Sequence, residues 1–172
     1  MKQADYYNNV FNTDYAGDKG AFENVHNEML KMYQGGKVLD IGCGTGNFLK
    51  KLLEVGVIGD GLDFSSVGLK KTKEKCPESK LFLLEANKAD IYNDYEVFVM
   101  SEFLEHIDDD RGLISKLPNG SKVIVSVPTF DWVSHVRFFE TEQSVTERYG
   151  DLIAIENLQK IGGNFIFNGK VK

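Results

Sequence analysis

Three glycines in one short segment have a spacing that suggests ligand binding. Gly42, Gly44 and Gly46 follow the apolar residues 38–41, where a strand is expected to turn into a helix. A residue without a Cβ atom lets the backbone approach a ligand closely at such a turn. The spacing differs by one residue from the G-x-G-x-x-G pattern of dinucleotide-binding loops. A dehydrogenase is therefore the least favoured interpretation of this loop.

Two aspartates indicate what the loop binds. Asp40 lies at the mouth of the loop, where its carboxylate would repel a diphosphate and attract a cationic amine. Asp63 comes 21 residues after Gly42, at the end of the second expected strand. An acidic side chain at that position can accept hydrogen bonds from both hydroxyls of a ribose. A ribose and an ammonium group together describe S-adenosylmethionine, which is the expected cofactor.

Strands and helices alternate along the chain and would position these residues. The alternation predicts an α/β fold with a doubly wound sheet that binds ligands at the carboxyl ends of its strands. Apolar periodicity predicts strands at 37–41, 57–62, 81–86, 96–100, 122–127, 152–155 and 164–167, and helices at 18–34, 48–53, 65–75, 103–107 and 140–149.

The motifs resemble those of class I S-adenosylmethionine-dependent methyltransferases of the small-molecule type. The resemblance covers about residues 20–172 and implies a Rossmann-like, mostly parallel seven-stranded sheet with an antiparallel last strand and helices on both faces. The matching segments are Asp-Ile-Gly-Cys-Gly-Thr-Gly at 40–46, Gly-Leu-Asp-Phe-Ser at 61–65, Ser-Glu-Phe-Leu-Glu-His at 101–106, Leu-Pro-Asn-Gly at 117–120 and His-Val-Arg-Phe-Phe at 135–139.

The resemblance also implies roles at matching positions. Asp40 would face the methionine amine, Asp63 the ribose and Phe64 the adenine. Segment 85–90 departs from the family pattern, so Asn87 is the expected partner of the adenine amino group, with Asp90 nearly as well placed. The complete set of expected cofactor-binding residues is Asp40, Gly42, Cys43, Gly44, Asn47, Asp63, Phe64, Asn87 and Ser101.

Titratable residues near the ends of the fourth and fifth strands are candidates for catalysis. Methyl transfer from a sulfonium needs alignment, and it needs a base where the acceptor loses a proton. Glu102, Glu105 and His106 have the i, i+3, i+4 spacing that places side chains on one face of a helix. His135 follows the fifth strand. The predicted catalytic residues are His135, as general base, with Glu102 and His106.

The same side chains could bind a divalent cation. Glu102, Glu105, His106 and His135 together offer oxygen and nitrogen ligands for Mg²⁺ or Mn²⁺. A Glu-x-x-Glu-His segment is found in the metal-assisted ubiquinone-pathway O-methyltransferases and small-RNA 2′-O-methyltransferases. It is also found in metal-free members, where it caps and packs the helix. We expect no metal, and keep a metal site as the alternative.

Composition sets further bounds. A length of 172 residues predicts a single domain, 1–172, in which residues 1–20 form an N-terminal arm. Tyr6, Tyr7 and Tyr15 of this arm would either pack on the sheet or close over the cofactor. A net charge of −6 argues against broad nucleic-acid binding. Two cysteines without metal-type spacing and no long apolar run predict a cytoplasmic protein that neither enters a membrane nor carries a disulfide.

These observations favour an enzyme that methylates an O or N atom of a small metabolite. Segment 128–139 is too short for a lid, so the arm or a second subunit of a homodimer would have to exclude water from a compact acceptor. The alternatives are a metal-assisted RNA 2′-O-methyltransferase and a non-catalytic module that binds a cofactor or a partner. The sequence does not identify the acceptor.

Overall fold

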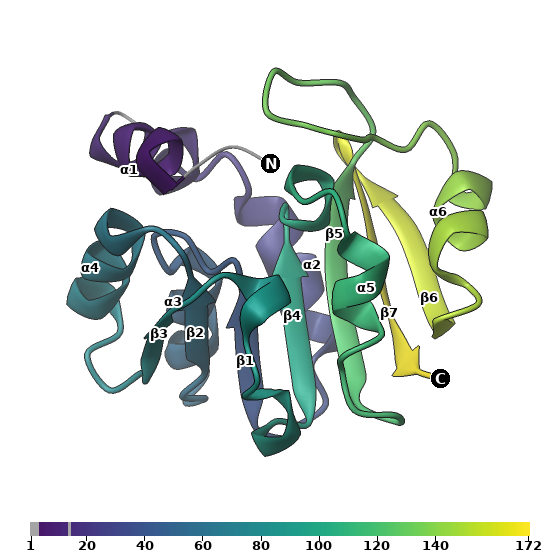
Figure 1. Cartoon of the computed structure of the whole chain (residues 1–172), viewed down its shortest axis with the longest axis horizontal. Helices are drawn as coiled ribbons and strands as arrows, with labels where there is room; N and C mark the ends of the chain where they lie inside the picture. Colours follow the sequence, from purple (N-terminus) through teal and green to yellow (C-terminus); the bar gives the residue numbers. More distant parts are fainter. Residues whose placement is uncertain (1–3, 14) are drawn as a thin grey trace.

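A seven-stranded sheet forms the centre of the computed structural model, which describes residues 4–13 and 15–172 (Figure 1). The strand order is β3-β2-β1-β4-β5-β7-β6. The five strands from β3 to β5 run parallel, and β7 runs antiparallel to both β5 and β6. The expected doubly wound, mostly parallel sheet with an antiparallel last strand is therefore confirmed. The strands are β1 Val38–Ile41, β2 Asp60–Asp63, β3 Leu81–Leu83, β4 Val97–Ser101, β5 Lys122–Pro128, β6 Ile153–Ile161 and β7 Asn164–Val171.

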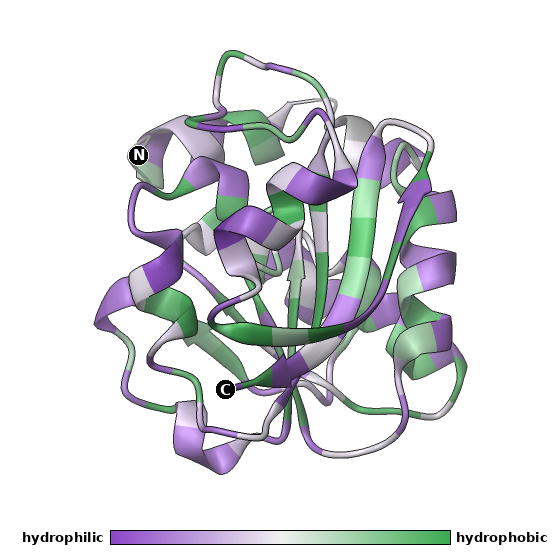
Figure 2. Ribbon diagram, turned by 90° about the vertical axis from the view of Figure 1, so that its right-hand side faces the viewer, coloured by the Kyte–Doolittle hydropathy of each residue, from purple (hydrophilic) through white to green (hydrophobic). Residues whose placement is uncertain are grey.

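Helices cover both faces of the sheet because strand side chains alternate between two apolar cores. In β4, Val97 and Val99 belong to one core, and Phe98 and Met100 belong to the other. The first core includes residues of α2, α3 and α4, and the second includes residues of α5 and α6. In Figure 2 the central strands are mostly coloured as hydrophobic, whereas the helices alternate between the two colours. The helices are α1 Ala4–Asn12, α2 Glu23–Met32, α3 Asn47–Glu54, α4 Ser66–Lys75, α5 Asp110–Ile114 and α6 Glu142–Tyr149.

Local signals fix the starts of three helices. Gly46 adopts a φ of 77° immediately before α3, a conformation that favours glycine. The Ser65 hydroxyl accepts the N–H of Gly68 at 3.0 Å and caps α4. Thr141 and Ser144 form a reciprocal capping box at the start of α6. The glycine loop and the end of β2 are thus each followed directly by a defined helix.

The segment after β4 differs from the expected helix at 103–107. Only a 3₁₀ turn, η4 (Leu104–His106), follows β4, and α5 begins at Asp110. Glu102 lies before this turn with a φ of 49°, because its N–H is held by the Ser126 hydroxyl of β5 at 2.9 Å. The expectation that Glu102, Glu105 and His106 share one helical face is therefore wrong.

The limits of several other helices and strands also differ from those expected from the sequence. The helix expected at 18–34 is divided into the 3₁₀ turn η1 (Ala16–Lys19) and α2. The third strand ends three residues early, and the turns η2 (Ala86–Lys88) and η3 (Tyr92–Asp94) follow it. The last two strands are longer than expected because they pair with each other over most of their length. Among the described residues, no helix has the length and apolar character needed to cross a membrane.

Tyr149 joins α6 to the core beneath the site. Its side chain is fully buried and its ring stacks on that of Phe167 at 5.8 Å. Its hydroxyl donates a hydrogen bond to the carboxylate of Asp110 at 2.8 Å. Asp110 is also buried, so its oxygens depend on protein donors rather than on water.

Replacing Tyr149 by phenylalanine should lower the free energy of unfolding by about 1.5–3 kcal/mol, the usual range for a hydrogen bond to a charged group. Urea denaturation measures this change. Tyr33→Phe is the matched control, since its hydroxyl donates to the Gly36 carbonyl in an exposed position and its loss should cost less than about 0.5 kcal/mol. Equal losses in both variants would contradict a stabilising role for the buried bond.

Candidate functional site

A cavity of about 480 Å³ lies at the carboxyl ends of β1, β2 and β4, within the usual size range of small-molecule sites. Its walls come from the glycine loop, the ends of these strands, η4, the loop after β5 and the N-terminal arm. Every residue expected to bind the cofactor, act in catalysis or hold a metal lines this cavity: Asp40, Gly42, Cys43, Gly44, Asn47, Asp63, Phe64, Asn87, Ser101, Glu102, Glu105, His106 and His135.

The glycine loop needs glycine for backbone conformation and for space. Gly42, Gly44 and Gly46 all have positive φ values, of 76°, 53° and 77°. A Cβ atom on Gly42 would overlap the ring of Phe103, and one on Gly46 would lie 2.7 Å from Thr72. The loop therefore packs tightly against neighbouring side chains and presents its backbone to the cavity.

Asp63 connects the loop after β1 to the end of β2. One carboxylate oxygen accepts the N–H of Gly44 at 2.9 Å, and the other accepts the N–H of Ser65 at 2.7 Å. A carboxylate has about four lone-pair sites, so Asp63 can still accept hydrogen bonds from a ligand. Sequence reasoning assigned it a ligand contact only, and the structure adds this role in shaping the loop.

Asp40 and Asp63 together make this end of the cavity strongly attractive to cations. Burial raises the pKa of Asp40 to about 8, with the charge of Asp63 as the second cause. Burial raises the pKa of Asp63 to about 6, although hydrogen bonds from backbone N–H groups lower it. A cationic ligand would favour the ionised form of both carboxyl groups.

A buried acceptor atom lies at the end of β3. Asn87 donates through Nδ2 to the carbonyl of Asp109 at 3.2 Å, which leaves its Oδ1 buried with no hydrogen-bond partner in the described structure. An amino group of a ligand could donate to this oxygen. Asp90, the other residue considered for this contact, is exposed and does not line the cavity. Phe64 lies nearby, and its ring packs against Tyr7 at 5.4 Å.

Three further expected residues line the cavity and already have protein contacts. The side-chain oxygen of Asn47 accepts a hydrogen bond from Lys75 at 2.6 Å. Cys43 is buried, and burial raises the pKa of its thiol. The Ser101 hydroxyl lies 3.1 Å from Nε2 of His26. These side chains shape the wall, and only part of each is available to a ligand.

Glu102 lines the cavity directly after the end of β4. Its Oε1 accepts a hydrogen bond from the Ser126 hydroxyl at 2.7 Å. Burial raises its pKa to about 7, although the bond from Ser126 lowers it. The positive φ of this residue is a backbone conformation that is uncommon outside glycine and is concentrated at functional sites.

Two histidines, His106 of η4 and His135 of the loop after β5, line the cavity with their ring centroids 5.1 Å apart. We call this part of the cavity the acceptor end. Nδ1 of His106 bonds the carbonyl of Ser134 at 3.0 Å, and Nδ1 of His135 bonds the carbonyl of Phe130 at 3.2 Å. A carbonyl oxygen only accepts, so both Nδ1 atoms carry hydrogen and both Nε2 lone pairs are free of it. Burial lowers the pKa of His106 to about 4 and also lowers that of His135.

Glu105 lies beside these histidines. It is fully buried, and neither carboxylate oxygen has a hydrogen-bond partner among the described residues. Burial and the nearby charge of Glu102 raise its pKa, against the attraction of Arg137. Burial thus disfavours the charged form of Glu105, His106 and His135 alike.

Glu105, His106 and His135 each place one ligand atom within 4.8 Å of the others. Glu102 is not part of this group, so the expected four-residue ligand set is reduced to three. Two imidazoles and one carboxylate suit transition-metal ions better than Mg²⁺, which prefers oxygen ligands. The residues could hold such an ion, but the same buried geometry also suits a proton-transfer site.

The N-terminal arm closes over the cavity. Asn8 of α1 accepts a hydrogen bond from the Ser65 hydroxyl at 2.7 Å, and Phe11 is buried against the glycine loop. Asp18 accepts hydrogen bonds from the Thr45 hydroxyl at 2.6 Å and from Lys75 at 2.7 Å. Tyr6, Tyr7 and Tyr15 all line the cavity.

Sequence reasoning missed several wall residues. His26 falls between the apolar residues of α2 and was indistinguishable from core by periodicity. Phe103 fills the space above Gly42, and only its place within the 101–106 motif could have indicated it. Burial lowers the pKa of His26 to about 4, so its imidazole is neutral. Other wall residues that were not singled out are Phe22, Phe48, Glu85, Phe130, Trp132 and Ser134.

The sequence matches known methyltransferases. The profile of a family described as "Methyltransferase domain" matches residues 16–165. A curated relative, ubiquinone biosynthesis O-methyltransferase from Shewanella sp. (strain ANA-3), is 30% identical over 86 residues. The alignment covers 46% of this chain and 36% of the relative, so the match spans about a third of the relative's length.

Solved structures share the fold across nearly the whole chain. The N-methyltransferase NodS from Bradyrhizobium japonicum WM9, in complex with S-adenosyl-L-homocysteine, has a TM-score of 0.81 at 14% identity and covers 98% of this chain and 97% of its own. Magnesium protoporphyrin IX methyltransferase from Synechocystis PCC 6803 has a TM-score of 0.69 at 15% identity, with 92% and 85% covered. The overall architecture is therefore that of these enzymes.

Gly42→Ala should destabilise the protein more than Gly56→Ala. Both glycines have a positive φ, of 76° and 78°, so both variants carry the strain of the left-handed region, about 1–2 kcal/mol. Only Gly42 faces the Phe103 ring, whereas nothing lies within 4 Å of a Cβ atom on Gly56. Urea denaturation of both variants measures the difference. Equal midpoints would show that contact with Phe103 does not require glycine.

Proposed function

Because the family profile covers most of this chain, which thus belongs to the methyltransferase-domain family, we propose that it transfers a methyl group from S-adenosylmethionine to an O or N atom of a small molecule. The observation that carries the proposal is the pair of buried carboxyl groups, Asp40 and Asp63, on either side of the glycine loop. A cationic, ribose-containing ligand complements this pair better than a dinucleotide does.

The cofactor would supply an electrophilic methyl group on a sulfonium. Asp40 would bind its amino group, and the free lone pairs of Asp63 would accept from its ribose hydroxyls. The unpartnered Oδ1 of Asn87 would accept from the adenine amino group, with Phe64 beside the ring. Gly42 and Gly44 would leave space for the ligand along the loop, and Cys43, Asn47 and Ser101 would complete the wall.

The acceptor would bind among His135, His106 and Glu102. His135 is neutral near pH 7 because burial lowers its pKa, so its free Nε2 can take a proton from a hydroxyl or amine. The hydrogen bond from Nδ1 to Phe130 fixes the ring for that role. The N-terminal arm would exclude water from the reacting groups.

The comparisons and the charge favour a small acceptor. The curated relative is named an O-methyltransferase, NodS is named an N-methyltransferase, and the second fold neighbour is named for a magnesium porphyrin. A net charge of −6 disfavours RNA as acceptor. A non-catalytic module would have no need of two half-buried, neutral histidines that line the cavity. A homodimer, a cytoplasmic location and a single domain over 1–172 stay predictions.

A metal-assisted reaction is the second candidate. It is favoured by one observation, the convergence of Glu105, His106 and His135 within 4.8 Å. The carboxylate of Glu105, which lacks a hydrogen-bond partner among the described residues, would gain a cation as its partner. The ion would bind and orient the acceptor oxygen, and His135 would then serve as a ligand rather than as a base.

The affinity for S-adenosylmethionine should rise by up to tenfold per pH unit between pH 6.0 and 7.5. Asp40 is mostly protonated at pH 6, because its pKa is about 8, and a bound ammonium requires its ionised form. Binding therefore releases a proton from Asp40. The affinity increases with pH because a larger fraction of Asp40 is already ionised before binding. Isothermal titration calorimetry in buffers of different ionisation enthalpy measures both the affinity and the released proton.

Asp40→Asn is the control for this measurement, since it should bind more weakly and lose the pH dependence above pH 7, where Asp63, with a pKa of about 6, is mostly ionised. NAD should not bind detectably to either protein. A wild-type affinity that is independent of pH would contradict the role of Asp40. Tighter binding of NAD than of S-adenosylmethionine would overturn the proposed cofactor.

His135→Ala should reduce turnover by roughly 10²–10⁴-fold, the usual contribution of a general base. Radiolabelled S-adenosylmethionine with a panel of metabolite and RNA acceptors identifies a substrate for the assay. Val133→Ala is the control, because Val133 lies in the same loop with 73% of its surface exposed and should turn over normally. Cofactor affinity should stay unchanged in both variants.

Metal removal separates the two candidate reactions. If His135 is the base, chelation by EDTA leaves wild-type turnover unchanged. If it is a ligand, chelation abolishes turnover, Mn²⁺ restores it, and Glu105→Gln has the same effect as His135→Ala. Normal turnover of His135→Ala with a verified acceptor would exclude both roles.

A further inference from the structure

The loop that carries His135 has few apolar anchors. Phe130, Trp132 and Val133 are 45%, 62% and 73% exposed, and Phe138 is exposed as well. Phe139 is buried only where the loop ends. Apolar burial therefore does little to fix the position of His135. Some other interaction has to hold this segment against the cavity.

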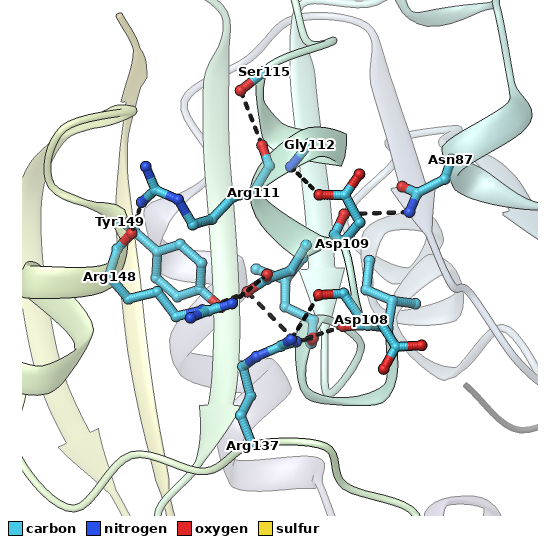
Figure 3. A network of polar contacts seen from close by, with 12 residues as sticks. Asn87, Asp108, Asp109, Arg111, Gly112, Ser115, Arg137, Arg148 and Tyr149 are labelled. Carbon is cyan, nitrogen blue, oxygen red and sulfur yellow. Dashed lines mark hydrogen bonds and ion pairs between the residues drawn. The ribbon is translucent and has the colours of Figure 1, made fainter.

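Arg137 supplies that interaction. Its guanidinium donates to the main-chain carbonyls of Leu104, of Ile107 at 2.5 Å and of Asp108 at 2.9 Å. Figure 3 shows the side chain reaching from the loop toward the main chain at Asp108. These carbonyls lie in and directly after η4, where a short 3₁₀ turn cannot satisfy them itself.

Two further hydrogen bonds join the same segments. The N–H of Val136 donates to the carbonyl of Glu105 at 2.8 Å, and Nδ1 of His106 donates to the carbonyl of Ser134 at 3.0 Å. The loop is thus bonded to η4 immediately before and immediately after His135. These hydrogen bonds set the separation between the two histidines and Glu105.

A buried carboxylate holds the guanidinium in place. Asp110 lies 3.5 Å from Nη1 of Arg137 and accepts two hydrogen bonds from Arg148, at 2.7 and 2.6 Å. Burial acts to raise the pKa of Asp110, but the hydrogen bonds from Arg148 and Tyr149 lower it overall. Asp110 is therefore ionised at neutral pH and serves as a fixed counterion for Arg137.

We infer that Arg137 is a positioning residue for methyl transfer: its contacts with the carbonyls after β4 and with Asp110 align His135 with His106 and Glu105. The inference rests on the proposed function. A planar guanidinium with five donors can serve three carbonyls and a carboxylate at once, whereas an ammonium cannot. Arg137 itself does not line the cavity, so it acts only through the residues it aligns.

Arg137→Lys tests this role, because it keeps the charge beside Asp110 and loses the fork that binds the carbonyls. We expect kcat to fall between about tenfold and a hundredfold, the cost of a small misplacement of reacting groups, with a smaller change in KM. Arg111→Lys is the matched control. Arg111 also binds a carboxylate, that of Asp151, and the carbonyl of Arg148, but it does not contact the His135 loop.

A second measurement needs neither cofactor nor acceptor. The chain contains three histidines, so a long-range ¹H–¹⁵N spectrum at pH 8 reports the tautomer of each. In the wild type, His106 and His135 should both carry hydrogen on Nδ1. In Arg137→Lys their signals should shift toward an average of the two tautomers, while those of His26, which bonds Ser101 on the far wall, stay unchanged.

The outcomes separate the inference from the proposed function. Unchanged tautomers of His106 and His135 in Arg137→Lys would overturn the inference about Arg137. An equal change at His26 would also overturn it, because it would indicate a general loosening of the protein. Equal losses of kcat in Arg111→Lys would also overturn it. If the wild type methylates no acceptor, the proposed function fails, and the spectrum of the ligand-free protein still decides whether Arg137 aligns the histidines.

Discussion

The hydrogen bonds of one buried carboxylate connect the parts of this structure that matter most for ligand binding. Asp63 accepts backbone N–H groups from the loop after β1 and from the start of the segment leading into α4. This arrangement fixes the shape of the glycine loop, and with it the start of α3 and one wall of the cavity. A second buried carboxyl group, Asp40, lies at the same end of the cavity, and burial raises its pKa to about 8. A cationic ligand there would favour the ionised form of this carboxyl group.

The sheet was predictable because strand patterns depend on local sequence. Alternation of Val97, Phe98, Val99 and Met100 between two cores is what a strand covered on both faces requires. The segment after β4 was not predictable, since apolar spacing alone suggested a helix there. Its real course depends on a hydrogen bond from the Glu102 N–H to Ser126 and on one from Arg137 to the Leu104 carbonyl, two partners that are distant in sequence. Boundaries set by tertiary contacts of this kind leave no periodic signal in the chain.

The site could be predicted where residues follow strand ends directly. Asp40, Asp63 and Glu102 lie in the cavity because the carboxyl ends of adjacent parallel strands meet at one edge of the sheet. His26 was missed, since it lies in an otherwise apolar helix whose register against β4 is a property of the folded chain. The relation among Glu105, His106 and His135 also required the fold, because only the course of the loop after β5 brings the third residue to the other two.

The two ends of the cavity differ in the charge of the ligand groups that they favour. At the glycine loop, burial raises the pKa of two carboxyl groups, and a positive ligand would favour their ionised form. At the acceptor end, burial keeps His106 and His135 neutral and raises the pKa of Glu105. Transfer of a methyl group away from a sulfonium removes positive charge from the first end. In the proposed reaction, a neutral imidazole at the second end could accept the proton that the acceptor releases, because its Nε2 carries no hydrogen and its Nδ1 is held by a main-chain carbonyl.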